Sequence, residues 1–132
     1  MADILARKQQ ALKGASKLQK KSIQEIKSLP RAPDLVETLV QTQMILLQEP
    51  AREWKKMMAV YADPTLLFNK LADFNCDTIP DAVLLKANAS MKTPDFTEEA
   101  MKKKSSAAGA LSAWVIGIVT AANLQKEAEI IS

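Results

Sequence analysis

The chain has 132 residues, of which 48% are hydrophobic and only 5% aromatic, and its net charge is +3. That length allows one domain at most, and so many periodic aliphatic residues exclude a disordered chain. There is no histidine, and Cys76 is the only cysteine. These counts remove the commonest general base, nearly all zinc sites and any internal disulfide, so we expect a reducing compartment such as the cytoplasm.

Positive charge is concentrated in the first quarter of the chain. Residues 1–31 contain eight basic and two acidic residues, a net +6, whereas residues 32–132 contain ten basic and thirteen acidic residues, a net −3. The basic character therefore belongs to the first segment and does not indicate a chain that binds polyanions throughout. We expect no nucleic-acid partner, and no membrane partner because no uninterrupted apolar run reaches the length needed to cross a bilayer.

Residues 3–29 contain no proline and are rich in Ala, Leu, Lys and Gln, so they predict one helix about 40 Å long. Two heptad frames compete in this helix. The first frame places Leu5, Lys8, Leu12, Ala15, Gln19, Ser22, Ile26 and Leu29 on one seam, and the second places Ile4, Ala11 and Leu18 there. A helix this polar is marginal by itself, so we expect it to pack against a partner.

All six prolines lie between residues 30 and 94 and divide the middle of the chain into short helices. We expect helices at 34–48, around the stripe from Trp54 to Tyr61, after Asp63-Pro64 and after Pro80. The inward-facing residues of the third of these are predicted to be Leu66, Leu67, Leu71 and Phe74.

The last helix is predicted to start at Asp95, with Glu98 three residues later as in a capping box. Its apolar stripe runs to residue 131, so its first half should pack in the tip and its second half should pair, antiparallel, with the first helix. Both outer helices begin and end without caps, as expected for part of a longer coiled coil. The predicted fold is all-α: about six short helices at the tip of an antiparallel two-helix coiled coil, with stalk helices at 1–29 and 115–132 and a globular tip at 30–114.

Enzyme chemistry is not indicated. The sequence has no Gly-rich phosphate loop and no metal-ligand spacing, so we expect a non-catalytic chain with no cofactor. Two basic clusters remain, at Arg52, Lys55 and Lys56 and at Lys102–Lys104. If the last helix starts at Asp95, the second cluster opposes the helix dipole, which would suit an acidic partner; the alternative is a solvated face balanced by Glu98 and Glu99.

These elements resemble the microtubule-binding domain of dynein heavy chains, which lies at the tip of the dynein stalk. The likeness covers nearly the whole chain in order. Its blocks are Ser28-Leu29-Pro30-Arg31-Ala32-Pro33, Glu53-Trp54-Lys55, Asp63-Pro64 with Leu66-Leu67, Ile79-Pro80-Asp81-Ala82-Val83, Pro94-Asp95-Phe96, and Lys102-Lys103, Ser105, Ala107-Ala108, Leu111 and Trp114-Val115. The Asp-Pro and Pro-Asp-Phe blocks are more similar to axonemal than to cytoplasmic dyneins.

The resemblance implies that the tip binds α/β-tubulin through its first, third and sixth small helices. It also implies that the stalk communicates, by a change of coiled-coil register, with a distant ATPase ring that is not in this chain. The location implied is the cytoskeleton, in particular a cilium or flagellum. The basic residues that we expect to contact acidic tubulin are Arg52, Lys55, Lys56, Lys86, Lys102, Lys103 and Lys104.

Three positions depart from the family pattern. Glu37 stands where the first small helix usually has a lysine, and Leu85 and Ala113 stand where basic residues are common. Residues 32–114 contain nine basic and eleven acidic residues, so electrostatic attraction to tubulin should be weak. The alternative reading is a protein-interaction tip that docks an accessory leucine-rich-repeat light chain.

Overall fold

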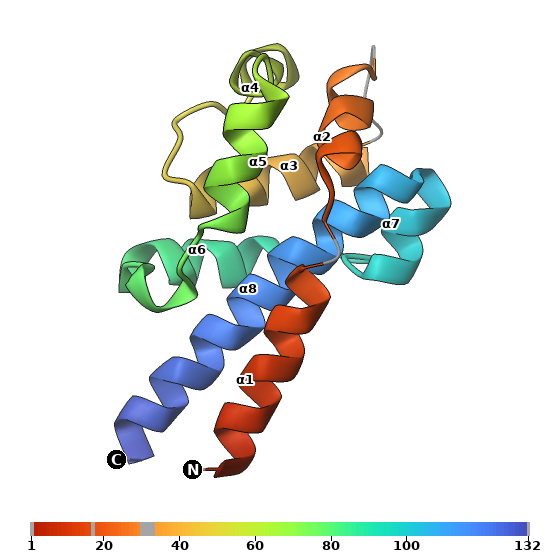
Figure 1. The fold of residues 1–132 in the computed structure, drawn as a ribbon. Coiled ribbons are helices and arrows are strands. Elements are labelled where there is room, and N and C mark those ends of the chain that lie inside the picture. The colour runs from red at the N-terminus through yellow and green to blue at the C-terminus, as the bar shows by residue number, and fades with distance from the viewer. Residues whose placement is uncertain (1, 17, 30–33, 132) are drawn as a thin grey trace.

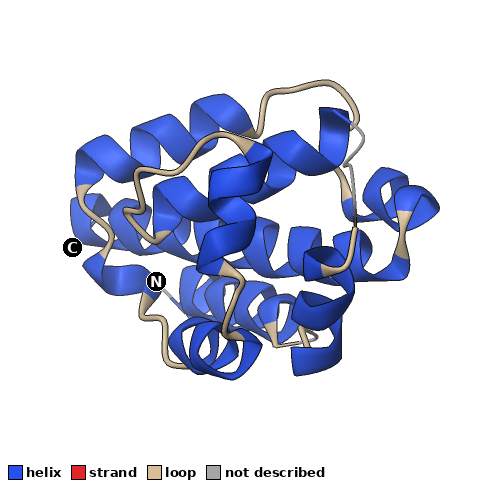
Figure 2. Cartoon of the chain, turned by 90° about the horizontal axis from the view of Figure 1, so that it is seen from above, coloured by secondary structure: helices blue, strands red, loops and turns tan. Residues whose placement is uncertain are grey.

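A computed structural model describes residues 2–16, 18–29 and 34–131, and every regular element in these ranges is helical. Figures 1 and 2 show a cluster of short helices from which two helices, carrying the two chain ends, extend side by side. Between residues 34 and 104 there are five α-helices and one 3-10 helix. The predicted all-α bundle of about six short helices is therefore confirmed.

The two extended helices are α1 (Ala2–Ala15) and α8 (Ser106–Ile131), which run antiparallel along much of their length (Figure 1). Far from the bundle, Ile4 packs against Leu124 and Ala128 in a small separate cluster. Nearer the bundle, the backbone of α1 at Ala11 and Ala15 approaches Gly117 of α8. The predicted antiparallel pairing of the first helix with the second half of the last one is confirmed.

The prediction of one continuous helix over residues 3–29 is wrong. Helix α1 ends at Ala15, and α2 (Lys20–Lys27) begins after Gln19, whose backbone is extended (φ −123°, ψ 157°). The break lets α2 turn onto α5 and α8, where Ile23 and Ile26 are fully buried. Burial of those two side chains in the tip outweighs the local preference for an unbroken helix, which contributes only tenths of a kcal/mol per residue.

The helices in the middle of the chain begin at or shortly after prolines. They are α3 (Asp34–Leu46), α4 (Trp54–Val60), α5 (Pro64–Ala72), the 3-10 helix η1 (Cys76–Thr78) and α6 (Asp81–Ser90). Pro64 occupies the first turn of α5, and the Asp63 carboxylate accepts a hydrogen bond from the Leu66 amide at 3.1 Å, which is the expected capping geometry. Leu67 and Leu71 are buried as predicted, but Leu66 is 54% exposed, so its predicted inward position is wrong.

The last predicted helix is also divided. Asp95 lies in the left-handed region (φ 66°), and Thr97 instead caps α7 (Glu98–Lys104) by accepting from the Ala100 amide at 3.1 Å. Ser105 is extended (φ −164°, ψ 152°), and its Oγ accepts from the Ala108 amide at 2.9 Å, so it caps the next helix. A serine side chain that satisfies a free amide explains why α8 starts afresh at Ser106.

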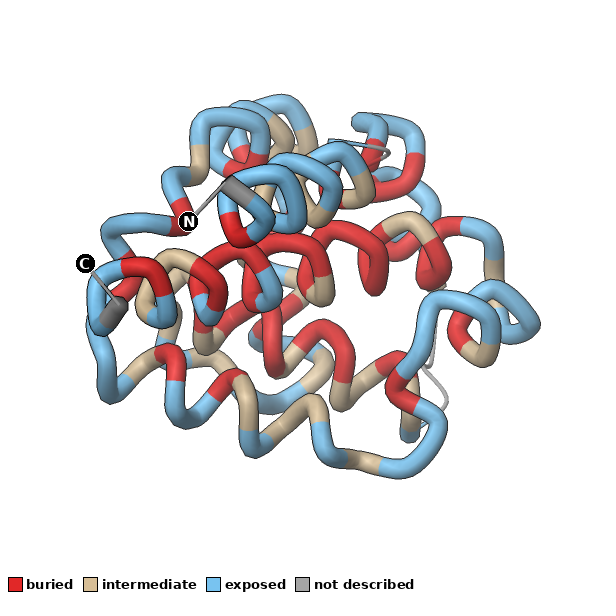
Figure 3. Tube along the Cα trace, turned by 90° about the horizontal axis from the view of Figure 1, so that it is seen from below, coloured by how far each residue is buried: buried red, intermediate tan, exposed pale blue. Residues whose placement is uncertain are grey.

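Helix α8 forms the centre of the core. It contacts α1, α2, α3, α6, α7 and η1, and its bundle half is almost continuously buried (Figure 3). A segment of it, Ser106–Ile130, is apolar and long enough to cross a bilayer, contrary to the expectation from the sequence, but 78% of its most apolar window is buried inside the protein. That degree of burial is typical of a core helix.

Two pairs of polar side chains link helices in or beside the core. The Tyr61 hydroxyl hydrogen-bonds with Gln43 Oε1, and both residues are fully buried. The Thr42 and Ser90 hydroxyls are 2.5 Å apart and join α3 to α6. Because a buried polar group without a partner is costly, these pairs favour one arrangement of α3 against α4 and α6.

Substituting Gly117 should separate the two long helices. A Cβ there would lie 2.5 Å from the Ala11 carbonyl oxygen and 3.0 Å from the Ala15 amide nitrogen, and neither backbone atom can move without its helix. We expect Gly117→Ala to lower the free energy of unfolding by about 1–3 kcal/mol, as overpacking does. Urea unfolding followed by circular dichroism measures this.

Gly14→Ala is the matched control, because a Cβ at Gly14 has no atom within 4 Å. It should raise the free energy of unfolding by up to about 1 kcal/mol, the gain in helix propensity. Equal effects at the two glycines would contradict the close approach of α1 and α8.

Candidate functional site

The lysines Lys102, Lys103 and Lys104 form the last turn of α7, and all three are exposed. The first turn of the same helix holds Glu98 and Glu99. Acidic residues at the start and basic residues at the end both complement the helix dipole. The expectation that these lysines oppose the dipole is wrong, because Ser105 ends their helix.

The end of α7 is held closely against α8. A Cβ at Gly109 would lie 2.9 Å from Lys102 Cβ and 3.1 Å from Lys102 Cα, so only glycine allows this approach. The stem of Lys102 is therefore fixed on α8, while the residue as a whole stays exposed to solvent. The three charges have a defined position relative to α8, which is also the helix that leads away from the bundle.

The second predicted cluster lies at the start of α4 and in the loop before it, where Arg52, Lys55 and Lys56 are exposed. The Arg52 guanidinium donates to the carbonyl oxygens of Glu49 (2.5 Å) and Ala51 (2.7 Å), so part of its donor capacity fixes the loop. Lys56 lies 3.9 Å from the Glu53 carboxylate, and both side chains are at least 70% exposed. Such a pair contributes little to stability.

Arg52 and Lys86 of α6 line the same surface hollow, together with Glu49 and Val83. Glu37 lies close to this region, since the Gln41 side-chain amide reaches both the Glu37 carboxylate (3.5 Å) and the Arg52 carbonyl (2.9 Å). The basic charge here is thus next to acidic groups, which reduces its net field.

The seven predicted basic residues do not form one patch. In Figure 1 helix α4 lies at the top of the bundle, α6 at the left and α7 at the right. The structure brings Arg52 and Lys86 together and leaves the α7 lysines as a separate group. The most concentrated positive charge on the described part of the tip is therefore the last turn of α7.

Three polar links between the long helices and the bundle were not predicted. Lys8 Nζ lies 2.8 Å from Asp77 Oδ1 of η1 and 2.8 Å from Gln125 Oε1 of α8. Lys126 Nζ lies 2.8 Å from Asp81 Oδ1 of α6. The side chains of Asn88 and Asn123 exchange two hydrogen bonds, of 3.0 and 2.9 Å. The sequence contained a signal only for Lys8, which is a charged residue on a predicted heptad seam.

Acid should weaken the contact between Lys8 and Asp77, because the hydrogen bond from Lys8 lowers the pKa of the Asp77 carboxyl group. The folded protein binds that proton less tightly than the unfolded chain, so the stabilisation is complete above the unfolded-state pKa of about 3.9 and is lost as pH falls through the lower folded-state pKa. The difference in free energy of unfolding between the unaltered chain and Asp77→Asn should be greatest above about pH 5 and vanish towards pH 2. A difference that does not depend on pH in urea titrations would contradict this.

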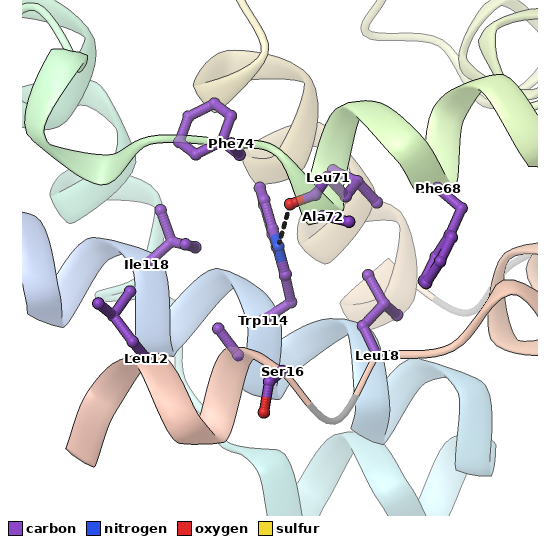
Figure 4. Close-up of a pocket in the computed structure, with 10 residues that line it drawn as sticks. Leu12, Ser16, Leu18, Phe68, Leu71, Ala72, Phe74, Trp114 and Ile118 are labelled. Atoms are coloured by element: carbon purple, nitrogen blue, oxygen red, sulfur yellow. Dashed lines mark hydrogen bonds between the residues drawn. The ribbon is translucent and has the colours of Figure 1, made fainter. Parts of the chain in front are cut away.

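An apolar pocket of about 330 Å³ lies beside the interruption between α1 and α2. Figure 4 shows its lining, with Leu12 and Ser16 from α1 and the turn after it, Leu18 beyond them, and Trp114 from α8. Trp114 Nε1 donates to the Leu71 carbonyl at 3.3 Å, and its ring meets Phe74 edge-on, with centroids 5.4 Å apart. The pocket lies where the path of the first helix changes direction.

The described residues offer no metal site, since no group of three or more Cys, Asp or Glu side chains comes together among them. Burial and the hydrogen bond to Asp77 raise the pKa of the Cys76 thiol to about 11. A thiol with so high a pKa is a poor nucleophile.

A family model described as the microtubule-binding stalk of dynein motor matches residues 2–128. The chain belongs to this dynein stalk family. The match runs through the bundle and both long helices, in α8 as far as residue 128. The family resemblance seen in the sequence is confirmed.

Known dynein heavy chains are similar to this stalk chain. The axonemal heavy chain 2 of Homo sapiens is 35% identical over 108 residues, 81% of this chain. The cytoplasmic heavy chain of Drosophila melanogaster is 26% identical over 113 residues, 85% of this chain, and the flagellar inner arm I1 dynein-1-beta heavy chain of Chlamydomonas reinhardtii is 27% identical over 110 residues, 83% of this chain. This chain spans only 2% of the length of each of these three relatives. Since both axonemal and cytoplasmic chains match, the preference for an axonemal dynein stays a prediction.

Proposed function

We propose that this chain binds microtubules as the end of a dynein stalk. The observation that carries the proposal is the family match over residues 2–128, because it includes the complete bundle and both helices that leave it. The chain would be a non-catalytic part of a motor whose ATPase ring lies elsewhere in the heavy chain. The site of action would be the cytoskeleton, in particular a cilium or flagellum.

The α7 lysines are the best candidates for tubulin contacts. They are exposed, adjacent and fixed on α8, so a partner would meet three positive charges without first ordering a loop. Arg52, Lys55, Lys56 and Lys86 would contribute less, since Arg52 and Lys56 already contact neighbouring groups. With an acidic excess over residues 32–114, we expect binding to be weak and strongly dependent on salt.

The predicted division, with stalk helices at 1–29 and 115–132 and the tip at 30–114, is kept as a proposal with one change: α2 packs onto α5 and α8, so that only α1 of the first segment would belong to the stalk. The interruption between α1 and α2 would be the place where a change in register of the first helix reaches the tip, since it lies beside the apolar pocket. Its conversion to helix would shorten the path between α1 and α2, because a helix rises only about 1.5 Å per residue. That would draw α1 along α8 and couple the tip to the ring.

A second candidate function is docking of an accessory protein such as a leucine-rich-repeat light chain. It is favoured by two exposed leucines on the tip helices, Leu66 on α5 (54% exposed) and Leu85 on α6 (72% exposed). Exposed apolar side chains mark an interface where they lie in one contiguous patch, so docking would require these two leucines to be contacted together.

Cosedimentation with microtubules at low and moderate salt separates the two functions. Direct binding predicts pelleting at low salt that decreases as salt rises. Docking alone predicts no pelleting at either salt, together with binding of a leucine-rich-repeat light chain that is lost in Leu85→Asp. Leu85→Asp should leave microtubule pelleting unchanged if the α7 lysines make the contact.

A further inference from the structure

Lys8 connects three helices through one ammonium group. Its Nζ is 2.8 Å from Gln125 Oε1 on α8 and 2.8 Å from Asp77 Oδ1 on η1, while its side chain is only 14% exposed. Asp77 is held in place in turn, because its backbone amide donates a hydrogen bond to the Asn75 side-chain oxygen at 2.9 Å. Charge-assisted bonds of this length require all three helices to be in register.

Lys8 also occupies an apolar seam. The α1 residues that turn towards α8 follow a 4-3-4 spacing, in which Lys8 is the one charged member: Ile4, Lys8, Ala11 and Ala15. This seam combines positions from both predicted heptad frames. A single polar residue at a seam position selects one register of a coiled coil, at some cost in stability.

A shift of register would separate Lys8 from its partners. One helical turn is about 5.4 Å, and the α8 residues one turn from Gln125 are Ala121 and Glu129. Either displacement moves the ammonium away from Asp77, and the one towards Ala121 leaves it facing a methyl group. The close approach of the α1 backbone to Gly117 also favours the observed register.

We propose that Lys8 is a register latch that holds α1 in the observed position against α8 and the tip. Lys8 acts as a positioning residue, since it lies on the opposite side of the interruption from the tip helices. That the latch changes microtubule affinity rests on the proposed function, in which register and affinity are coupled.

The neighbouring polar links show which helix the latch restrains. Lys126 pairs with Asp81, and Asn123 exchanges hydrogen bonds with Asn88, so α8 is tied to α6 of the tip independently of α1. Removing Lys8 therefore frees α1 to move along α8. Removing Lys126 should leave the register of α1 against α8 unchanged. The two ion pairs have the same length of 2.8 Å, which makes Lys126 a matched control.

The test compares Lys8→Met with Lys126→Met by electron–electron distance measurement between spin labels at Ala6→Cys and Glu127→Cys, both exposed positions. The buried Cys76 is kept, and the chain with Cys76 alone measures background labelling. We expect a single population of label-to-label distances in the unaltered chain and in Lys126→Met. Lys8→Met should add a second population displaced by about one helical turn.

Microtubule cosedimentation of the same variants, without labels, is the second measurement. We expect Lys8→Met to change the dissociation constant by at least about fivefold, the lower end of ordinary coupling between sites, and Lys126→Met to leave it within about twofold. The charge exchange Lys8→Asp with Asp77→Lys should restore a single distance. If Lys8→Met does not fold by circular dichroism, Asp77→Asn removes the same ion pair and should give the same two populations.

A single distance in folded Lys8→Met and Asp77→Asn would overturn the latch, even if every variant pellets with microtubules. Two populations in those variants without any pelleting would support the latch and reject the proposed function. Equal second populations in Lys8→Met and Lys126→Met would show general loosening and would also overturn the latch.

Discussion

Trp114→Ala should lower the free energy of unfolding by about 3–5 kcal/mol, the usual loss for a buried Trp. Trp114 is 3% exposed and packs edge-on against Phe74. Its removal also leaves the Leu71 carbonyl without the indole donor. The site borders the apolar pocket beside the α1–α2 interruption, so side chains there already leave space unfilled and have little freedom to close a larger cavity. Urea unfolding monitored by circular dichroism gives the value.

Trp54→Ala is the control for that substitution, because Trp54 is only half-buried at the start of α4. The decrease in the free energy of unfolding for Trp54→Ala should be less than half of that for Trp114→Ala. A loss below about 1.5 kcal/mol for Trp114→Ala, within the range of ordinary surface and partly buried changes, would contradict the central position of this side chain.

Reversing two charges at the end of α7, with Lys102→Glu and Lys103→Glu, should weaken microtubule binding at least about tenfold at low salt. The change replaces two positive charges by two negative ones on a helix end that is fixed on α8, so the repulsion from an acidic surface cannot be relieved by a loop movement. It also places acidic groups at the negative end of the helix dipole, which should cost α7 no more than about 1–2 kcal/mol. Pelleting isotherms measure the affinity, and circular dichroism checks the fold.

The matched control reverses two lysines of the other basic group, with Lys55→Glu and Lys56→Glu. These residues lie on α4, beside Glu53 and across the bundle from α7. We expect a smaller effect, about threefold, that comes mainly from the change in net charge. Equal effects of the two double variants would reject the assignment of the main contact to α7.

Much of the fold could be predicted because proline and aliphatic spacing determine it locally. Pro64 and Asp63 define the start of α5, and the stripe through Val36, Leu39 and Val40 defines the buried face of α3. Leu66 was predicted to face inwards but is exposed, since a residue adjacent to a true core position such as Leu67 can point outwards.

The two helix breaks could not be predicted, because no proline marks them and Gly14, close to the first break, is still helical. Ser105 ends α7 through its own side chain and backbone, in a stretch of good helix formers. Gln19 precedes α2 without a side-chain cap, and only the burial of Ile23 and Ile26 against distant helices explains the turn. The first break therefore results from contacts between residues far apart in the chain, whereas the second is capped locally by Ser105.

The candidate site was predicted as a set of residues but not as an arrangement. The sequence identified exposed lysines, and the structure separates them into two groups and gives those on α7 a favourable helix end. Lys8 was recognisable as a charged residue on a seam, whereas its partner Asp77 is 69 positions away in the sequence. Pairing over such a distance depends on the tertiary fold and leaves no local signal.

The central claim is that this chain itself binds microtubules, and cosedimentation of the unaltered chain over a salt series tests it most directly. We predict pelleting that saturates with tubulin concentration at low salt and an affinity that falls steadily as the Debye length shortens from about 30 Å at 0.01 M to 10 Å at 0.1 M salt. A folded chain that stays in the supernatant at the lowest salt, at every microtubule concentration, would contradict the account.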